Sequence, residues 1–238
     1  MISGGLTAML DLTILGDTCF PVAMSSHFYS PLNLKVITPR LELRGATDDL
    51  LARLLPVVRA DVAEGRPYPF DDPMSLYEDN PVRERKWIQA IWRGRGTARP
   101  DSWRLYFVTL VGGQAVGMQD LVGVNFDTFQ TVISFSWLAP GIRRQGLGLE
   151  MRAAILHLAF AGIGAAEATS DAFFDNLASN RVSEAMGYQP DGHDWATRRG
   201  EPAALDCWRL TRNTWATKRR TDIELIGVEE CKSVLHIL

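Results

Sequence analysis

The feature that most constrains the fold is a strand-to-helix junction in the middle of the chain, residues 129–160. An apolar run, FQTVISFSWLA, is stopped by Pro140 and followed by Arg143, Arg144 and the glycine-rich sequence QGLG. Apolar residues then recur at helical spacing as far as Phe160. A strand and a helix joined in this way must bury their apolar sides in a shared core. The loop between them is either a plain turn with solvated arginines or a binding site for an anion.

The anion interpretation rests on the chemistry of helix N-termini. The first backbone N–H groups of a helix have no partner within the helix, and the helix dipole places partial positive charge there. Glycines let a loop wrap closely around a ligand, and Arg143 and Arg144 add charge at the same place. The segment has no GKS or GKT sequence and no GxGxxG spacing, which excludes a P-loop and a dinucleotide-binding turn. This segment alone favours neither the plain turn nor the anion-binding site.

The rest of the chain mixes strand and helix patterns. Alternating or apolar runs predict strands near residues 41–44, 103–111, 114–124, 166–173, 193–198 and 203–210, with a Gly-Gly turn at 112–113. Helical patterns follow Thr47, Pro81 and Thr211 and also cover residues 146–160 and 178–186. We therefore predict an α/β (α+β) protein with a sheet of mixed direction, because strands dominate the middle of the chain.

Four of the helices have a face that we predict to be buried, because apolar residues recur at helical spacing. In the helix after Thr47 this face consists of Leu50, Leu51, Leu54 and Leu55, and in the helix after Pro81 of Trp87, Ile88, Ile91 and Trp92. In the helix of residues 146–160 this face consists of Leu149, Ala153, Leu156 and Phe160. In the helix of residues 178–186 it consists of Ala178, Val182, Ala185 and Met186.

Length and composition set the domain organisation and exclude some functions. The 238 residues suit one domain, residues 36–218, with an N-terminal extension, 1–35, and a C-terminal tail, 219–238. A net charge of −3 argues against nucleic-acid binding. Asp11 interrupts the apolar stretch near the start, which falls short of the roughly 20 residues of a membrane span. Three distant cysteines predict no metal site and a cytoplasmic location.

Four sequence matches decide between the two interpretations of the loop. Residues 143–148, RRQGLG, match the Arg/Gln-x-x-Gly-x-Gly/Ala loop of the GNAT superfamily of acyl-CoA N-acyltransferases. Residues 38–44, TPRLELR, resemble the opening strand of the branch that includes the ribosomal-protein N-terminal acetyltransferases. Residues 176–188, NLASNRVSEAMGY, resemble that branch's Asn-x-x-Ser…Gly-aromatic segment, and SWLAP resembles its fourth strand. The chain is thus identified as a GNAT protein over about residues 36–212, which favours the phosphate site.

The resemblance implies a mostly antiparallel sheet whose fourth and fifth strands splay apart to bind acetyl-CoA. It implies that Trp137 and Leu138 offer backbone hydrogen bonds to the pantetheine arm, with an N–H near Leu138 as the oxyanion donor. Asn176 would contact the CoA arm, and Ser179 would open the helix beneath it. The loop that holds the CoA pyrophosphate would consist of Arg143, Arg144, Gln145, Gly146, Leu147 and Gly148.

The catalytic groups are less well defined by the sequence. Residues 131–134 lack the glutamate that many family members use as the base, and the nearest substitute is Asp120 in the apolar run MQDLVGV, where burial would raise its pKa. Asp120 is otherwise a structural aspartate. Many family members have a tyrosine seven residues after the motif asparagine, and this tyrosine protonates the departing thiolate as a general acid. Counted from Asn176, this chain has Ser183 at that position. Three alternatives remain for the departing thiolate: Ser183 protonates it, water protonates it, or it leaves without an acid. In the last two cases Ser183 is a surface serine with no catalytic role.

The acceptor is predicted to lie against a proline-rich loop, residues 65–81, unless that loop is an ordinary solvated connection. Its side chains suit a cationic amine, because it carries three aromatic and four acidic residues: Tyr68, Phe70, Tyr77, Asp71, Asp72, Glu78 and Asp79. We expect an acetyl-CoA-dependent N-acetyltransferase acting on a protein N-terminus or a cationic small molecule. The alternatives are a non-catalytic acyl-CoA sensor and an enzyme that uses a longer donor such as succinyl-CoA. We also predict a homodimer, because two-fold oligomers are common among soluble enzymes.

Overall fold

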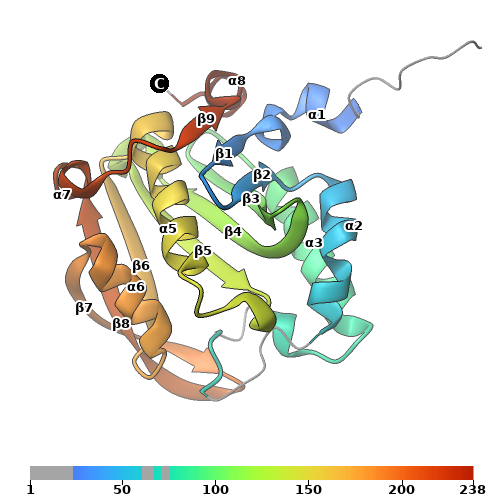
Figure 1. The fold of residues 1–238 in the computed structure, drawn as a ribbon, viewed down its shortest axis with the longest axis vertical. Coiled ribbons are helices and arrows are strands. Elements are labelled where there is room, and N and C mark those ends of the chain that lie inside the picture. The colour runs from blue at the N-terminus through green and yellow to red at the C-terminus, as the bar shows by residue number, and fades with distance from the viewer. Residues whose placement is uncertain (1–23, 61–66, 71–74, 238) are drawn as a thin grey trace, which may run out of the picture.

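The structure is a computed structural model that describes residues 24–60, 67–70 and 75–237 (Figure 1). Its strands are β1 (Lys35–Ile37), β2 (Glu42–Gly45), β3 (Ser102–Val111), β4 (Gln114–Val124), β5 (Thr131–Leu138), β6 (Glu167–Phe173), β7 (Gln189–Arg198), β8 (Glu201–Thr211) and β9 (Glu224–Ile226). Its helices are α1 (Met24–Phe28), α2 (Asp48–Arg59), α3 (Val82–Gly96), α4 (Phe126–Phe129), α5 (Leu147–His157), α6 (Leu177–Met186), α7 (Arg212–Lys218) and α8 (Val228–Leu235). Short turns of helix are η1 (Ser30–Asn33), η2 (Ser75–Tyr77), η3 (Pro140–Ile142) and the π-helical η4 (Leu158–Ile163).

All nine of these strands form one sheet, in the order β7-β8-β6-β5-β4-β3-β2-β1-β9. Neighbouring strands are antiparallel except for β5 and β6, which run parallel. The predicted mixed, mostly antiparallel α/β sheet is therefore confirmed. The parallel pair is joined by α5, because a parallel connection needs a crossover long enough to return to the same end of the sheet.

Side chains alternate across the sheet, so each face has its own core. On β3, Phe107 packs with the residues of α5, while its neighbour Val108 packs with those of α2 and α3. Figure 1 shows α5 and α6 in front of the sheet, with α2 and α3 on the other side. A ligand bound between β5 and β6 would therefore have α5 and α6 on one side of the sheet and α2 and α3 on the other.

The predicted N-terminal extension and C-terminal tail contribute to the same sheet and core. β9 pairs with β1, with Lys35 opposite Ile226, and extends the sheet at its edge. Cys231 and Leu235 of α8 are buried in the core beside α5, and Ser30 Oγ donates a hydrogen bond to the Glu230 carbonyl at 2.7 Å. Residues 1–23 of the extension lie outside the described part of the chain.

The predicted core face of α5 is only partly right. Leu156 and Phe160 are buried, but Leu149 is 38% exposed and Ala153 is half-buried. The buried set includes instead Leu147, Met151, Ala154 and Ile155. Because this helix is apolar on most of its circumference, its spacing alone does not show which side meets the sheet.

The predicted core face of α6 is only partly right, because Met186 packs partly buried against the core and Val182 is half-buried. Ala178 and Ala185 are exposed, and the buried residues of this helix are Asn180 and Ser183. Asn180 is satisfied inside the protein: its amide donates to the Phe173 carbonyl and to Asp206, and it accepts from the Trp208 indole, at distances of 3.0–3.2 Å. A fully bonded amide can replace an apolar side chain in a core, and the spacing rule misses it.

Candidate active site

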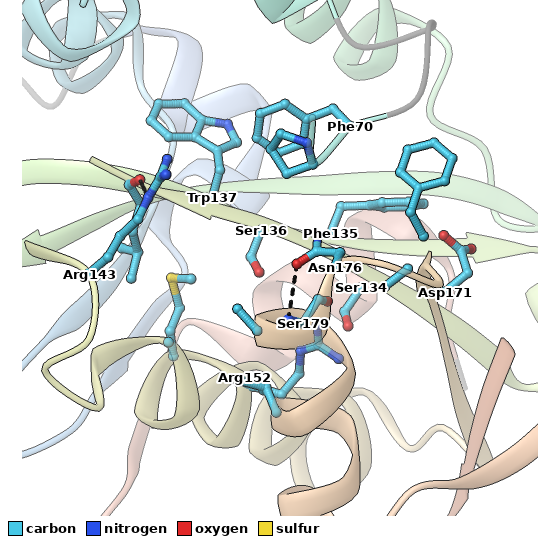
Figure 2. Close-up of a pocket in the computed structure, with 18 of the residues that line it drawn as sticks. Phe70, Ser134, Phe135, Ser136, Trp137, Arg143, Arg152, Asp171, Asn176 and Ser179 are labelled. Atoms are coloured by element: carbon cyan, nitrogen blue, oxygen red, sulfur yellow. Dashed lines mark hydrogen bonds between the residues drawn. The ribbon is translucent and has the colours of Figure 1, made fainter. Parts of the chain in front are cut away.

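The candidate site is a cleft of about 290 Å³ between β5 and β6. The two strands pair only from Thr131–Glu167 to Ile133–Thr169. Beyond that point β5 stays paired with β4 as far as Leu138, and β6 stays paired with β8 as far as Phe173. The strands therefore separate in a V whose closed end lies at Ser134, and Figure 2 shows the side chains that line it. This is the splay that the resemblance implied.

Beyond Ser134, the edge of β5 that faces this cleft has backbone groups that are not paired with a neighbouring strand among the described residues. The Val132 carbonyl accepts from Thr169 Oγ1 on β6 at 3.4 Å, whereas the Phe135 carbonyl accepts from Gln119 Nε2 on β4 at 2.8 Å. Because peptide groups alternate in direction along a strand, those of Ser134, Ser136 and Leu138 point into the cleft. An extended ligand can pair with such an edge as an added strand would.

The two backbone donors expected on β5 are placed differently. The Trp137 carbonyl points at β4, where a Cβ added to Gly117 would stand 2.3 Å from it. Trp137 contributes its side chain to the cleft instead. The Leu138 N–H points into the cleft, and the Leu138 carbonyl already accepts from Arg143 Nε at 2.9 Å. The geometry therefore provides Leu138 and Ser136, not Trp137, as backbone donors.

The glycine-rich loop lies at the open end of the cleft. Gly146 has a φ of +76° and caps α5, whose first backbone bond runs from Glu150 N–H to the Gly146 carbonyl. The N–H groups of residues 147–149 thus have no acceptor within the helix. Arg143 and Gly148 line the cleft, and a Cβ on Gly148 would meet nothing within 4 Å. These residues fit a pyrophosphate group; Arg144 and Gln145 are exposed and do not line the cleft.

A buried ionic cluster supports the loop from behind. Glu150, in the first turn of α5, accepts hydrogen bonds from Thr38 Oγ1 at 2.6 Å, from the Arg40 N–H at 3.1 Å and from Arg40 Nε at 2.5 Å. Arg40 Nη1 also donates to the Gln145 carbonyl at 3.0 Å. Burial alone would raise the pKa of Glu150, but the hydrogen bonds from Thr38 and Arg40 outweigh it and lower that pKa. The TPR sequence before β2 therefore fixes the glycine-rich loop to the sheet.

The N-terminus of α6 borders the cleft through Asn176 and Ser179. Asn176 caps this helix by accepting a hydrogen bond from the Ser179 N–H at 3.2 Å, and both residues line the cleft (Figure 2). Ser183 lies one turn further on, is 0% exposed and does not line the cleft. It is neither the predicted acid at the ligand nor the surface serine that we considered. The helix turns its side chain into the core, where Ser183 Oγ has no hydrogen-bond partner among the described residues.

Asp120, the predicted base, is buried on β4 beside the cleft. Arg104 Nε and Nη2 both donate to its Oδ2, at 2.9 and 2.6 Å, and the Arg104 guanidinium lies 5.2 Å from the centre of the Phe135 ring. Burial raises the pKa of Asp120, and the Arg104 charge opposes that rise. Asp120 does not itself line the cleft, so its role as base stays a prediction.

The predicted acceptor loop covers one side of the cleft with Pro69 and Phe70. The Tyr77 hydroxyl fixes this loop, accepting from the Phe70 N–H and donating to the Phe70 carbonyl, both at 2.8 Å. Glu78 pairs with Lys86 on α3, and Asp79 is exposed outside the cleft lining. Asp71 and Asp72 lie outside the described residues.

Sequence reasoning missed two charged residues of the cleft, Asp171 on β6 and Arg152 on α5. Asp171 lies in a predicted strand, and Arg152 in a predicted helix among apolar residues. A charge inside an apolar pattern is the signal that could have indicated both. Among the described residues, no group of three or more His, Cys, Asp or Glu side chains is arranged to hold a metal ion. Every described helix is too short or too polar to cross a membrane.

Solved structures share this fold. RimJ from Mycobacterium smegmatis, in complex with CoA-disulfide, matches with a TM-score of 0.66 and 17% identity over 81% of this chain and 97% of RimJ. RimL, a ribosomal L7/L12 α-N-protein acetyltransferase in complex with coenzyme A, matches with a TM-score of 0.58 and 17% identity over 74% and 96% of the chains. Spermidine N-acetyltransferase from Vibrio cholerae, in complex with CoA and spermine, matches with a TM-score of 0.56 and 14% identity over 74% of this chain and 98% of the spermidine enzyme.

The sequence also matches a family model, described as an acetyltransferase (GNAT) domain, over residues 40–189. This range is more than half of the chain and contains both splayed strands, the glycine-rich loop and α6. The chain therefore belongs to the GNAT family of acetyltransferases, whose members use acetyl-CoA as the acyl donor.

Proposed function

We propose that this acetyltransferase moves the acetyl group from acetyl-CoA directly to a primary amine, with both substrates bound at once. The observation that carries the proposal is a cleft with two different sides. One side has the helix terminus at Gly148 and the backbone donors of Ser136 and Leu138. The other has the aromatic ring of Phe70 and the carboxylate of Asp171.

On the donor side, the N-terminus of α5 and Arg143 would hold the pyrophosphate. The pantetheine arm would run along β5 toward the closed end of the V, paired with the Leu138 N–H. The Ser136 N–H, next along the same edge, would donate to the acetyl oxygen as it gains negative charge.

On the acceptor side, Asp171 is the group that we assign to the amine. It is exposed on β6, and it lines the cleft from the face of the sheet that also carries Phe135. A carboxylate there attracts a cationic amine and accepts a hydrogen bond from its nitrogen during attack. In this arrangement Asp120 stabilises Arg104 and the Phe135 ring, and acts as base only through an intervening water.

The reaction forms a bond from the amine nitrogen to the acetyl carbon and breaks the bond from that carbon to sulfur. The sulfur leaves with the electron pair and takes up a proton, while the amine loses one. In place of Ser183, we assign the hydroxyl of Ser179 to the neighbourhood of the sulfur, because Ser179 lines the cleft. Its oxygen would donate a hydrogen bond to the departing thiolate.

The acceptor is proposed to be a protein N-terminus or a cationic small molecule. The structural neighbours include enzymes named for each of these, a ribosomal-protein acetyltransferase and a spermidine acetyltransferase. A cytoplasmic location and a homodimer also remain proposals. The thiols of Cys207 and Cys231 are both free, which suits a reducing compartment, and light scattering of the purified protein measures the oligomeric state.

The function is tested by measuring thiol release from acetyl-CoA with a panel of peptide N-termini, polyamines and amino-acid amines. We expect turnover with at least one amine. The variant Asp171→Asn should lose about tenfold or more in kcat/KM for that amine while its affinity for CoA stays unchanged. Tight CoA binding with no thiol release from any amine would instead identify a non-catalytic acyl-CoA sensor.

The position of the donor is tested separately by Gly146→Glu. A side chain at this φ of +76° is strained, and a carboxylate there would repel the phosphates, so CoA affinity should fall by about 100-fold or more. The matched control is Gly141→Ala in the same loop, where an added Cβ meets nothing within 4 Å and affinity should not change. Unchanged affinity in Gly146→Glu would overturn the loop assignment.

A further inference from the structure

Arg152 is a buried cation at the closed end of the cleft. Its side chain reaches from α5 toward Ser134, as Figure 2 shows, and the residue is 4% exposed. Its Nη1 donates to Ser170 Oγ at 3.1 Å, and the guanidinium carbon lies 5.9 Å from the centre of the Tyr188 ring. Its Nε has no hydrogen-bond partner among the described residues.

The charge of Arg152 is also uncompensated. Within the described ranges, no carboxylate lies within 4.0 Å of it. Asp171 follows Ser170 in β6, so its side chain points to the other face of the sheet. Leaving a buried charge unpaired is strongly unfavourable, and a ligand of opposite charge that bound it would offset that cost.

The groups around Arg152 are suited to an anion. Ser134 Oγ and the Tyr188 hydroxyl are buried beside Arg152, and both Arg152 and Ser134 interact with the Tyr188 hydroxyl. Burial raises the pKa of the Tyr188 hydroxyl, while the nearby Arg152 opposes that rise. A guanidinium beside buried hydroxyl groups has the donor pattern that binds a carboxylate.

The direction of the cleft indicates which part of the donor reaches this cluster. The pyrophosphate site lies at the open end of the V, at residues 146–148. The cleft-facing peptide groups of Leu138, Ser136 and Ser134 then lead toward the closed end, where β5 and β6 begin to pair. The acyl group is at the opposite end of the donor from the pyrophosphate. Its far end therefore faces Arg152.

We propose that the closed end of the cleft accepts an acyl group that ends in a carboxylate, as in a short dicarboxylic acyl-CoA, and that Arg152 binds this carboxylate. The inference rests on the proposed acyl-CoA site. In the transfer, the bond between the acyl carbon and sulfur breaks, and the bond to the amine nitrogen forms. The amine gives up a proton, the thiolate takes one, and the carboxylate is unchanged. A cationic amine thereby becomes an amide with a negative charge.

The test compares binding of two donors of equal chain length, succinyl-CoA and butyryl-CoA, by calorimetry without an amine. The protein should bind succinyl-CoA about tenfold or more tightly, because a charged hydrogen bond is gained. In Arg152→Met this ratio should fall to about one, with the affinity for CoA itself unchanged. Arg152→Lys, which keeps the charge but not the planar fork, should retain part of the preference.

Two results would overturn the inference: equal or tighter binding of butyryl-CoA by the unaltered protein, or a ratio that Arg152→Met leaves unchanged. The first needs no variant, so the test survives if Arg152→Met does not fold. A fall in kcat with acetyl-CoA in Arg152→Met, with no donor preference in the unaltered protein, would assign Arg152 to the departing thiolate instead. Failure of the proposed function itself is distinguishable, because no amine would then release thiol from acetyl-CoA, whereas the donor preference is measured without an amine.

Discussion

Two serines one helical turn apart on α6 have opposite surroundings. Ser179 lines the cleft, whereas the hydroxyl of Ser183 is buried without a partner. Ser183→Ala should therefore leave kcat unchanged and leave the free energy of unfolding unchanged or raised by up to about 1 kcal/mol. Ser179→Ala should lower kcat by about tenfold if its hydroxyl assists the thiolate. Steady-state kinetics and urea unfolding measure both, and a loss of activity in Ser183→Ala alone would return the acid role to that residue.

Glu150 is a second residue with a defined expectation, in this case for pH. Its pKa in the folded protein is lowered, so its stabilising effect is complete above its pKa in the unfolded chain, about 4.3. That effect is lost as the pH falls further, through the lower folded value. Glu150→Gln should cost about 1–3 kcal/mol at pH 7 and should flatten the loss of stability below about pH 4.

Urea unfolding at a series of pH values measures this dependence. The matched control is Glu184→Gln, an exposed glutamate on α6, which should keep the original slope. An unaltered acid slope in Glu150→Gln would show that the buried cluster does not control acid stability. The same variant should raise the KM for acetyl-CoA, because Glu150 anchors Arg40, which in turn binds the glycine-rich loop at Gln145.

At the scale of elements, the β7–β8 hairpin holds the acceptor loop in place. Arg198, at the end of β7, donates to the Tyr68 carbonyl at 3.2 Å and to both oxygens of Asp175 at 2.8 and 3.0 Å. Its guanidinium carbon lies 4.3 Å from the centre of the Phe173 ring. The hairpin thus connects the loop that covers one side of the cleft to the end of β6.

Removing this connection should affect the amine and not the donor. Arg198→Ala should lower kcat/KM for the amine by about tenfold, because Phe70 and Asp171 would no longer be held in register, and leave the KM for acetyl-CoA unchanged. Glu201→Ala, an exposed residue across the same turn, is the control. Equal losses for both substrates would mean that the hairpin supports the whole cleft instead.

For the whole molecule, the C-terminal segment is part of the core. Leu235 of α8 is 3% exposed, and the adjacent Val234 is 42% exposed. Leu235→Ala should lower the free energy of unfolding by about 2–4 kcal/mol, whereas Val234→Ala should change it by less than about 0.5 kcal/mol. Urea denaturation of the two variants makes the comparison, and equal small effects would mean that α8 is a loosely attached tail.

The parts of this molecule that the sequence predicts are those encoded locally. Residues 143–148 carry their own signal, since a glycine with positive φ and a helix N-terminus occur within one short run. The Gly-Gly turn at 112–113 likewise predicts the β3–β4 hairpin, which the pairing of these strands confirms.

The parts of the fold and the site that the sequence does not predict depend on contacts between residues that are far apart in the chain. The polar buried face of α6 is explained only by Asp206 and Trp208, which lie on β8. The pairing of β9 with β1 joins segments from opposite ends of the chain over three residues. The sequence shows Arg152 as a charge among apolar residues, but only the V between β5 and β6 shows that its side chain lies at the closed end.

The separation of β5 and β6 has a kinetic consequence. β5 is held by β4 along its length and β6 by β8, so the gap between them is maintained by hydrogen bonds elsewhere in the sheet. No strand has to detach before a donor enters, and the binding-competent form is the folded form itself. The observed rate of donor binding should therefore rise linearly with donor concentration, without the plateau that a slow opening step would impose.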